Sequence, residues 1–251
     1  MATDEDALRW RVEAACRAAW PVPGEVLLDG WVLRAAGGPS RRANSANPLH
    51  ETAAMDEAFV AQVEAFYRER GRPAIFRIPD MAQGIDALLA ARGYRIDAPT
   101  TTLFAALDEL AQGDRAGALI EAALSERWLA ARDAMSGSSP ETARAYRATI
   151  GAITLPCGFA SVRQGARIVA LGFGVLQDDL LVVESVLTDP AERRRGHARA
   201  CLAGLFGWAA GQGVRSAALQ VMRENTAALA LYRGLGFRHD LYGYHYRVRT
   251  A

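Results

Sequence analysis

The sequence predicts an α/β protein with a mixed sheet, built from two related halves. Segments with the hydrophobic period of a strand alternate along the chain with segments that have the period of a helix. A nearly continuous apolar strand, Leu180–Leu187, is of the type buried on both faces, and a glycine-bearing loop and a helix follow it. A unit of strand, helix, glycine and aromatic residue occurs twice, at Gly93-Tyr94 and at Gly236-Phe237.

The first half is expected to contain three helices and four strands. Pro21 and Pro23 end the first helix, and Gly71 ends the second. The predicted elements are a helix over 4–19, strands over 26–36 and 42–49, a helix over 52–70, a strand over 74–78, a helix over 84–91 and a strand over 100–106.

The second half is expected to follow a polar linker over 108–115, which places the domains at 1–112 and 113–251. A hairpin is predicted to turn at Gln164-Gly165. The predicted elements are helices over 117–133 and 140–151, hairpin strands over 158–162 and 166–176, a strand over 180–187, a helix over 199–212, a strand over 216–221, a helix over 226–234 and strand-like segments over 242–248.

The two related units align at an offset of 143 residues, which brings Gly93 onto Gly236, Ile78 onto Val221 and Leu88 onto Leu231. We interpret this as a duplication. The alternative is that any two strand–helix–turn units with alanine-rich helices align this well.

Composition excludes several classes of function. The formal net charge of +1 gives no basic field for nucleic acid or a membrane surface. All 29 basic residues are arginine, and the three cysteines show no disulfide or metal-ligand spacing, so no metal is expected. No apolar run reaches the length of a membrane span, and the acidic start argues against a secretory signal. We therefore expect a cytoplasmic protein, and a homodimer is possible.

The loop after the apolar strand, Arg193-Arg194-Arg195-Gly196-His197-Ala198, is a candidate phosphate cradle. A helix N-terminus offers unsatisfied N–H groups and the positive end of the helix dipole. Glycine lets the backbone close around an anion, and arginine adds charge. Taken alone, such a cluster is often only a solvated loop.

Two motifs in order then resemble the GNAT superfamily of acyl-CoA-dependent N-acetyltransferases. The Gln/Arg-x-x-Gly-x-Gly/Ala pattern of that family corresponds to Arg193–Ala198. Its Asn-x-x-Ala-x-x-x-Tyr pattern corresponds to Asn225, Ala228 and Tyr232, and Leu-Gly-Phe follows. The resemblance covers residues 117–251 well and the first half only as a degenerate copy, which implies a tandem GNAT-like acyl-CoA N-acyltransferase fold.

The resemblance implies a role for each matching residue. Backbone N–H groups of Arg194 to Arg199 would hold the pyrophosphate of the co-substrate acetyl-CoA. Val186 and Leu187, where the strand would diverge from its neighbour, would hydrogen-bond the pantetheine arm, which Asn225 would also contact. Tyr232 would protonate the leaving thiolate. The cofactor-binding set is Val186, Leu187, Arg193, Arg194, Arg195, Gly196, His197, Ala198, Arg199, Asn225, Ala228 and Tyr232.

Glu184 is the ionisable residue within Leu180–Leu187 and is expected to share a face with Val182 and Val186. Burial disfavours the ionised carboxylate, which suits a general base for an ammonium near neutral pH. The alternative is a salt bridge to an arginine of the first half. Tyr232 could likewise be a core aromatic residue, and Cys201 is expected to pack rather than to act as a nucleophile.

The first half lacks the equivalent residues, because the offset places Ala53 at Gly196, Ala82 at Asn225 and Leu89 at Tyr232. It is therefore expected neither to bind CoA nor to catalyse. Trp31, Arg34 and residues 42–47 are candidates for an acceptor-pocket wall, and a scaffold or dimer surface is the alternative.

The sequence thus predicts an N-acetyltransferase that transfers an acetyl group from acetyl-CoA to the amine of a small molecule or peptide by direct attack. The alternatives are a non-catalytic acyl-CoA-binding or regulatory module, and an anion-binding interaction protein.

Overall fold

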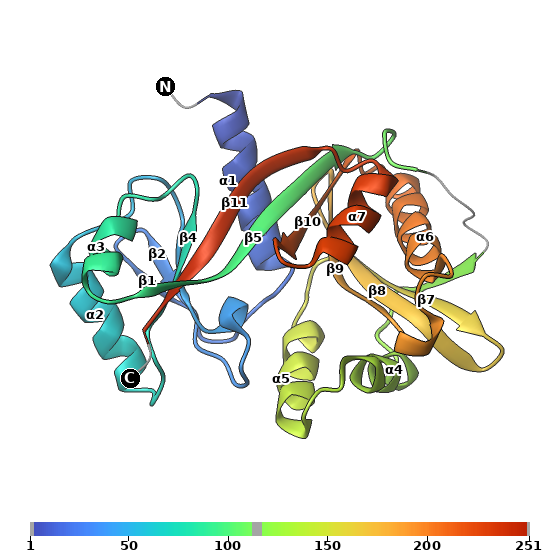
Figure 1. The fold of residues 1–251 in the computed structure, drawn as a ribbon, viewed down its shortest axis with the longest axis horizontal. Helices are drawn as coiled ribbons and strands as arrows, with labels where there is room; N and C mark the ends of the chain where they lie inside the picture. The colour runs from blue at the N-terminus through green and yellow to red at the C-terminus, as the bar shows by residue number, and fades with distance from the viewer. Residues whose placement is uncertain (1–2, 112–116, 250–251) are drawn as a thin grey trace. The chain divides into compact units, whose positions relative to one another are not determined.

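The computed structural model describes residues 3–111 and 117–249, and the chain forms two compact units (Figure 1). The first unit contains residues 1–102, 221–225 and 240–251, and the second contains 103–220 and 226–239. Among the described residues, no helix combines the length and the apolar character needed to cross a membrane.

The first part of the chain begins with α1, whose N-terminus is capped by Thr3 in a capping box. Its elements are α1 (Asp4–Ala18), β1 (Val26–Leu28), β2 (Trp31–Leu33), the 3-10 helix η1 (Arg41–Ala43), β3 (Ala46–Pro48), α2 (Glu57–Arg68), β4 (Ile75–Pro79), α3 (Asp86–Ala91) and β5 (Arg95–Ala106).

The rest of the chain contains the longer strands. Its elements are β6 (Ala118–Glu121), α4 (Glu126–Ser136), α5 (Pro140–Gly151), β7 (Cys157–Gln164), β8 (Arg167–Gln177), β9 (Leu180–Thr188), the 3-10 helix η3 (Pro190–Glu192), α6 (His197–Gly211), β10 (Ser216–Met222), α7 (Thr226–Leu235) and β11 (His239–Val248).

The sheet of the first unit has the strand order β1-β2-β3-β4-β11. β3 and β4 are parallel, and the other pairs are antiparallel. A core of large side chains, which includes the stacked Trp31 and Phe59 and the edge-on Phe76, packs with α2. Burial of this apolar surface is the main stabilising contribution to the unit.

The sheet of the second unit has the strand order β10-β9-β8-β7-β6, in which only the β9–β10 pair is parallel. Trp128 of α4 packs on Phe159 and Phe173, on one face of the sheet. Leu205 and Trp208 of α6 approach Gly174 on the other face. The sheet is therefore covered by α4 on one side and by α6 on the other (Figure 1).

The two units repeat one topology, as the duplication predicts. In each, a strand pairs in parallel with the strand after the next helix, as β3 with β4 and β9 with β10. A short helix then ends at a glycine with positive φ, +80° at Gly93 and +114° at Gly236, and a strand follows.

The last strand of each repeat is exchanged. β11 pairs antiparallel with β4 of the first unit, and β5, whose residues 103–106 belong to the second unit, is hydrogen-bonded to β10. The compact units therefore differ from the predicted linear division at 112, a position that lies outside the described residues, as do residues 112–115 of the predicted linker.

Three predicted elements differ from the structure. The strand expected over 26–36 is a hairpin, because Asp29 and Gly30 take φ of +47° and +82° and reverse the chain. The strand expected over 42–49 is η1 followed by β3. The helix expected over 117–133 begins only after Ser125, which caps α4, and β6 precedes it as an edge strand paired with β7.

Candidate active site

A β-bulge interrupts β9 next to Glu184. Glu184 pairs with Phe173 and Leu187 pairs with Leu171, so Ser185 and Val186 together face Gly172. Ser185 has φ of +54°, a left-handed conformation that is uncommon for residues other than glycine. A Cβ on residue 172 would lie 3.2 Å from the Val186 Cγ2 atom, so glycine gives the bulge its room.

The bulge changes which side chains share a face. Antiparallel partners lie on the same face, so Glu184 lies with Phe173 on the face that α4 covers. Beyond the bulge, Leu187 returns to this face by its pairing with Leu171, whereas Val186 lies over Gly172 on the opposite face. The expectation that Glu184 and Val186 share a face is therefore wrong, because one extra residue shifts the alternation.

The paired stretch of β9 and β10 ends before either strand does. Their parallel pairs run from Leu180–Ser216 to Val183–Leu219, although β9 continues to Thr188 and β10 to Met222. The half-buried residues Val186 and Leu187 thus lie in the part of β9 that has left the ladder with β10. Backbone groups of this kind are available to an extended ligand that adds to the strand.

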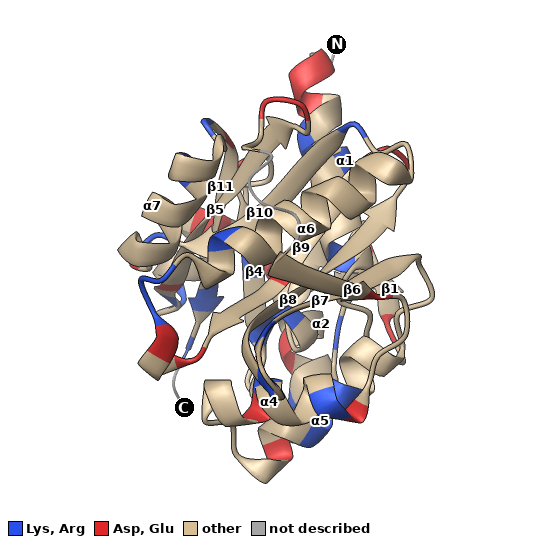
Figure 2. Cartoon of the chain, turned by 90° about the vertical axis from the view of Figure 1, so that its right-hand side faces the viewer, with Lys and Arg blue, Asp and Glu red and all other residues tan. Residues whose placement is uncertain are grey.

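The loop between η3 and α6 has the backbone of an anion-binding turn. Arg194 and Gly196 have φ of +63° and +83°, and left-handed residues in a turn help to form the concave arrangement of N–H groups called a nest. Gly196 is the N-cap of α6, and no side chain caps this helix end. The arginine run is drawn blue in the loop before α6 in Figure 2.

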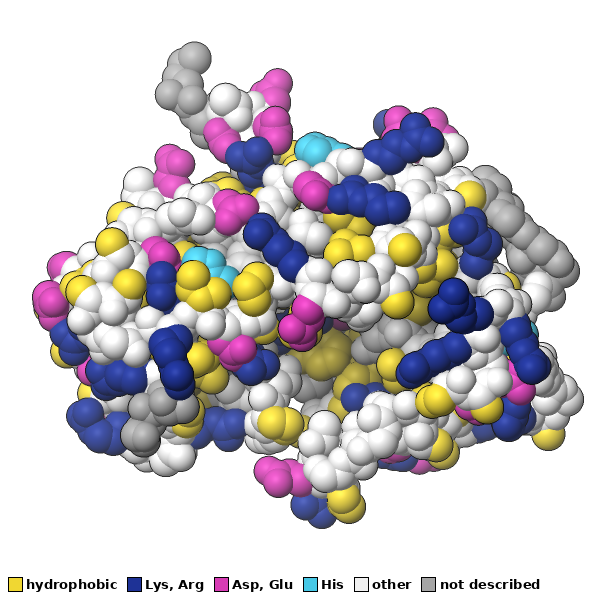
Figure 3. All heavy atoms as spheres, in the orientation of Figure 1, with side chains coloured by type: hydrophobic (Ala, Val, Ile, Leu, Met, Phe, Trp, Pro, Cys, Tyr) yellow, Lys and Arg dark blue, Asp and Glu magenta, His cyan; other side chains and the backbone are white. Residues whose placement is uncertain are grey.

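The side chains of this loop have different surroundings. Arg193 and Arg194 are exposed, and His197 and Ala198 are half-buried. The Arg199 guanidinium donates to the Gly234 carbonyl oxygen at 3.2 Å and so ties α6 to α7. Several basic side chains gather at the right of Figure 3, the side on which Figure 1 draws α6.

Glu192, which is buried in η3, anchors the loop to the β7–β8 hairpin. Its carboxylate accepts from Arg167 at 2.5 Å and from Arg195 at 2.7 Å, and the amide of Gln164 donates at 3.3 Å. A buried carboxylate with several charge-assisted donors is well compensated for its lost hydration. Glu192 lies next to the arginine run, but no sequence pattern singled it out as part of the site.

Glu184 and Tyr232 are both buried and lie close enough to interact electrostatically. Burial raises the pKa of Tyr232, and the charge of Glu184 raises it further. Tyr232 also packs edge-on to Phe237. The phenol is therefore protonated at neutral pH and holds a proton that it can donate.

A second phenol, which no sequence pattern indicated, also interacts electrostatically with Glu184. Tyr146 of α5 is buried beside the hydroxyl of Ser185, and the Arg132 guanidinium of α4 lies 3.7 Å from the centre of its ring. Tyrosine on an amphipathic helix has no pattern that separates such a position from ordinary packing.

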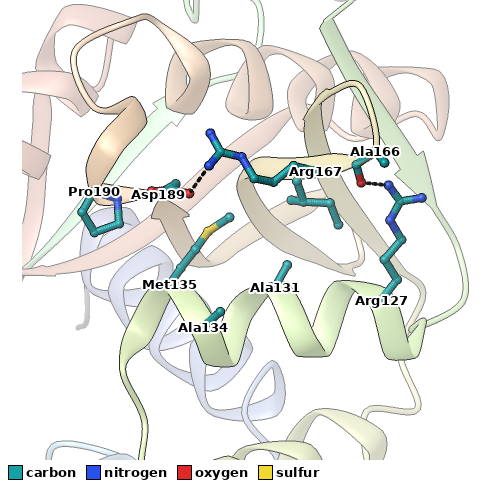
Figure 4. Close-up of a pocket in the computed structure, with 9 residues that line it drawn as sticks. Arg127, Ala131, Ala134, Met135, Ala166, Arg167, Asp189 and Pro190 are labelled. Carbon is teal, nitrogen blue, oxygen red and sulfur yellow. Dashed lines mark hydrogen bonds and ion pairs between the residues drawn. The ribbon is translucent and has the colours of Figure 1, made fainter.

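A pocket of about 320 Å³ lies between α4, the start of β8 and the residues Asp189 and Pro190 (Figure 4). Its apolar wall is Ala131, Ala134, Met135 and Ile168, with Pro190 at one end. Arg167 bridges to Asp189 there at 3.6 Å, and Arg127 donates to the Ala166 carbonyl oxygen. Asp189 and Pro190 connect this pocket in sequence to the loop before α6.

The remaining predicted residues lie on α7 or just before it, or in the first unit. The N–H of Asn225 donates to the Met222 carbonyl oxygen at 2.9 Å, and Ala228 is half-buried in the first turn of α7. Trp31 and Arg34 are buried, and Arg34 donates to the Arg42 and Trp20 carbonyl oxygens and to Glu25. They are core groups of the first unit, so their expected place on a pocket wall is wrong.

Comparison with known proteins decides the family. The family model described as "Probable histone acetyltransferase Rv0428c C-terminal" matches residues 8–250. The chain belongs to this acetyltransferase family. The "Uncharacterized N-acetyltransferase YobR" of Bacillus subtilis (strain 168) is 28% identical to this chain over 246 residues, which cover 95% of this chain and 98% of the relative.

Solved structures show the same GNAT fold. A GCN5-related N-acetyltransferase from Kribbella flavida superposes with a TM-score of 0.71 at 16% identity. The match covers 100% of this chain and 98% of the Kribbella chain. A tandem GNAT protein from the clavulanic acid biosynthesis pathway gives 0.66 at 11% identity, covering 99% and 88%. The predicted tandem GNAT-like fold is confirmed. Among the described residues of this chain, there is no group of three or more His, Cys, Asp or Glu side chains that could hold a metal ion.

Proposed function

We propose that the protein is an acetyl-CoA-dependent N-acetyltransferase whose single active site lies in the second unit. One observation carries the proposal most directly. The bulged, diverging end of β9 and the uncapped N-terminus of α6 are joined by the short loop that bears Arg194 and Gly196. An extended arm that ends in a pyrophosphate matches both features in sequence order.

In this proposal the N–H groups of residues 194–199 bind the pyrophosphate, with Arg193, Arg194 and Arg195 adding positive charge. The pantetheine arm adds to β9 as an extended strand at Val186 and Leu187. Asn225 and Ala228 contact the arm, as their match to the GNAT motif implies. The first unit, which has Ala53 and Leu89 buried at the positions equivalent to Gly196 and Tyr232, binds no CoA.

The reaction is direct attack of an amine on the thioester. Glu184 accepts the proton that the ammonium loses, and the free amine adds to the carbonyl carbon. The carbon–sulfur bond then breaks, and Tyr232 gives its proton to the leaving thiolate. The second proton that the nitrogen loses as it becomes an amide returns to Tyr232, and Glu184 releases its proton to solvent. The products are an N-acetylated acceptor and free CoA. Positioning of the two reactants supplies a large part of the rate.

Calorimetry with acetyl-CoA, followed by release of free thiol with a broad panel of primary amines, tests this function. We expect Tyr232→Phe and Glu184→Gln each to lower kcat by about a hundredfold or more, in the range of general acid–base effects, while acetyl-CoA still binds. Glu121→Gln, which alters a half-exposed carboxylate on β6, is the control.

Two outcomes contradict the proposal. If millimolar acetyl-CoA gives neither heat nor a thermal shift, the site is not a CoA site. If acetyl-CoA binds but no amine releases thiol above background, the protein is instead a non-catalytic acyl-CoA-binding or regulatory module.

A further inference from the structure

Tyr146 occupies a place on α5 that connects helix packing to the bulge of β9. Tyr146, Thr149 and Ile150 form the buried stripe of α5, at the i, i+3 and i+4 spacing of one helix face. Glu184 projects from the face of the sheet that α4 covers, and the Tyr146 phenol lies beside the bulged Ser185 that follows it. The phenol is therefore on the same side of β9 as the carboxylate.

Arg132 of α4 holds the ring of Tyr146 in place. Its guanidinium carbon lies 3.7 Å from the ring centre, a stacking distance for a cation on an aromatic face. The Arg132 Nη1 atom donates to Asp133 at 3.0 Å and to the hydroxyl of Ser138 at 2.9 Å. The guanidinium is thereby held by Asp133 of α4 and by Ser138 after the helix, and it limits the positions that the phenol can take.

The groups around the phenol are polar and come from different elements. Burial raises the pKa of Tyr146; the nearby hydroxyl of Ser185 and the charge of Arg132 lower it, and the charge of Glu184 raises it. Tyr146 is thus a neutral phenol at physiological pH, with a carboxylate, a hydroxyl and a guanidinium as neighbours. A residue that served only to fill the core would need none of these three groups.

The Arg132 Nε atom supports this view. It is buried without a hydrogen-bond partner in the described part of the chain. A buried donor that lacks an acceptor costs free energy, of order 1–3 kcal/mol, so natural cores seldom keep one without a compensating gain. Stacking on a ring whose position matters for the site is such a gain.

We propose that Tyr146 is an acceptor-side positioning residue, whose phenol hydrogen-bonds the attacking nitrogen and holds it against Glu184, with Arg132 fixing the ring. This inference rests on the proposed acetyltransferase function. Tyr146 forms no covalent bond to the acceptor and transfers no net proton. The nitrogen loses its proton to Glu184 and its lone pair forms the new bond to the acetyl carbon, while the phenol restricts the direction of attack.

The test compares Tyr146→Phe with Tyr67→Phe. Tyr67 is a matched control because it is also a buried helical tyrosine, and its hydroxyl donates to the Arg34 carbonyl oxygen at 2.9 Å in the core of the first unit. Acetyl-CoA affinity is measured by calorimetry. Two rates are measured by thiol release: transfer to the best primary amine of the panel, and slow hydrolysis of bound acetyl-CoA, in which water replaces the amine.

For Tyr146→Phe we expect kcat/KM for the amine to fall by about tenfold or more, the effect of losing one hydrogen bond to the nitrogen, with acetyl-CoA affinity unchanged. The rate of acetyl-CoA hydrolysis should also fall. Arg132→Lys, which keeps the charge but not the planar stack, should show a smaller loss of the same kind. Combined with Glu184→Gln, the loss from Tyr146→Phe should be less than additive, because both groups act on one nitrogen.

The proposal is overturned if Tyr146→Phe matches Tyr67→Phe in both rates, or if its loss appears as weaker acetyl-CoA binding or a lower Tm with normal kinetics for the folded fraction. It is also overturned if the losses from Tyr146→Phe and Glu184→Gln are fully additive. Failure of the wild-type protein to bind acetyl-CoA is a different result, and that result rejects the proposed function itself.

Discussion

Arg77 and Glu13 form a bidentate ion pair in the core of the first unit, with Nε 2.6 Å from Oε1 and Nη2 2.8 Å from Oε2. The Tyr242 hydroxyl donates to the same carboxylate at 2.6 Å, and the guanidinium stacks on Tyr244. The pair therefore joins α1, β4 and β11, and it fixes the exchanged C-terminal strand in the first unit.

Removing one partner of this pair should destabilise the protein strongly. Glu13→Gln leaves the Arg77 charge buried without a counter-charge, and such changes cost about 3–5 kcal/mol. Urea unfolding followed by circular dichroism should show an earlier first transition. Glu5→Gln, which breaks the exposed pair with Arg9, should change stability by no more than about 0.5 kcal/mol. Equal effects of the two substitutions would contradict this account.

The same pair predicts how stability depends on pH. Burial opposes ionisation of Glu13, but the charge and hydrogen bonds of Arg77 outweigh it, and the pKa of Glu13 falls below 4.5. A lowered pKa in the folded state stabilises the fold above the unfolded pKa and loses that contribution as pH falls through the folded value. The Tm difference between wild type and Glu13→Gln should thus be constant from about pH 6 to pH 8 and shrink well below about pH 4.

The left-handed glycine before α6 gives a prediction about binding. Gly196→Ala adds a Cβ that meets no atom within 4 Å, but it keeps φ at +83° only at a cost of about 1–2 kcal/mol. We expect acetyl-CoA affinity to fall by about tenfold as the loop relaxes. Gly165→Ala carries a comparable strain, with φ of +57° and open space, in the β7–β8 turn. Calorimetry should find a much smaller effect for this control.

Glu192 should matter for acetyl-CoA binding, although its carboxylate lies beside the loop that we propose binds the pyrophosphate. Glu192→Gln weakens the contacts that hold Arg167 and Arg195, so the loop loses its anchor to the hairpin. The lost negative charge alone would favour phosphate, whereas the lost anchor disfavours it. We expect the anchor to dominate and acetyl-CoA affinity to fall by about tenfold, as for other residues that orient a ligand-binding group. Tighter binding by the variant would show that charge dominates.

The turn before α6 was predictable because its signal is local. Gly196 follows three arginines and directly precedes a helical pattern. The glycine indicates the backbone freedom of the loop, and the arginines indicate its positive charge. The Asp29-Gly30 turn has an equally local signal, which the strand prediction for 26–36 overlooked. Elements of this kind depend on a few neighbouring residues and need no knowledge of tertiary structure.

The bulge and the strand exchange were not predictable from local patterns. Ser185 adopts a positive φ because the paired β8 and its Gly172 make room for it, and no residue near Ser185 announces this. β11 leaves its own repeat for β4, where Tyr242 meets Glu13 far away in the sequence. Tyr146 lies beside Ser185 of that bulge and stacks on Arg132, two contacts that no local sequence pattern indicates.

The reactivity of Cys201, a buried residue of α6, tests whether the transfer is direct or passes through an acetylated cysteine. Cys201 is fully buried in α6, and burial raises its pKa to about 12, so almost no thiolate exists near neutral pH. Native protein treated with iodoacetamide at pH 8 should therefore be labelled first at the half-buried Cys157 and hardly at all at Cys201. A Cys157→Ser variant shows the background labelling of the two buried thiols.

Direct attack also predicts the kinetic pattern. Double-reciprocal plots at several amine concentrations should intersect, since acetyl-CoA and the amine must be bound together before any product leaves. A thiol that carried the acetyl group would give parallel lines and a burst of free CoA without amine. Parallel lines that became intersecting in a Cys201→Ala variant would assign the nucleophile to Cys201, and they would limit Glu184 to a role in the second transfer.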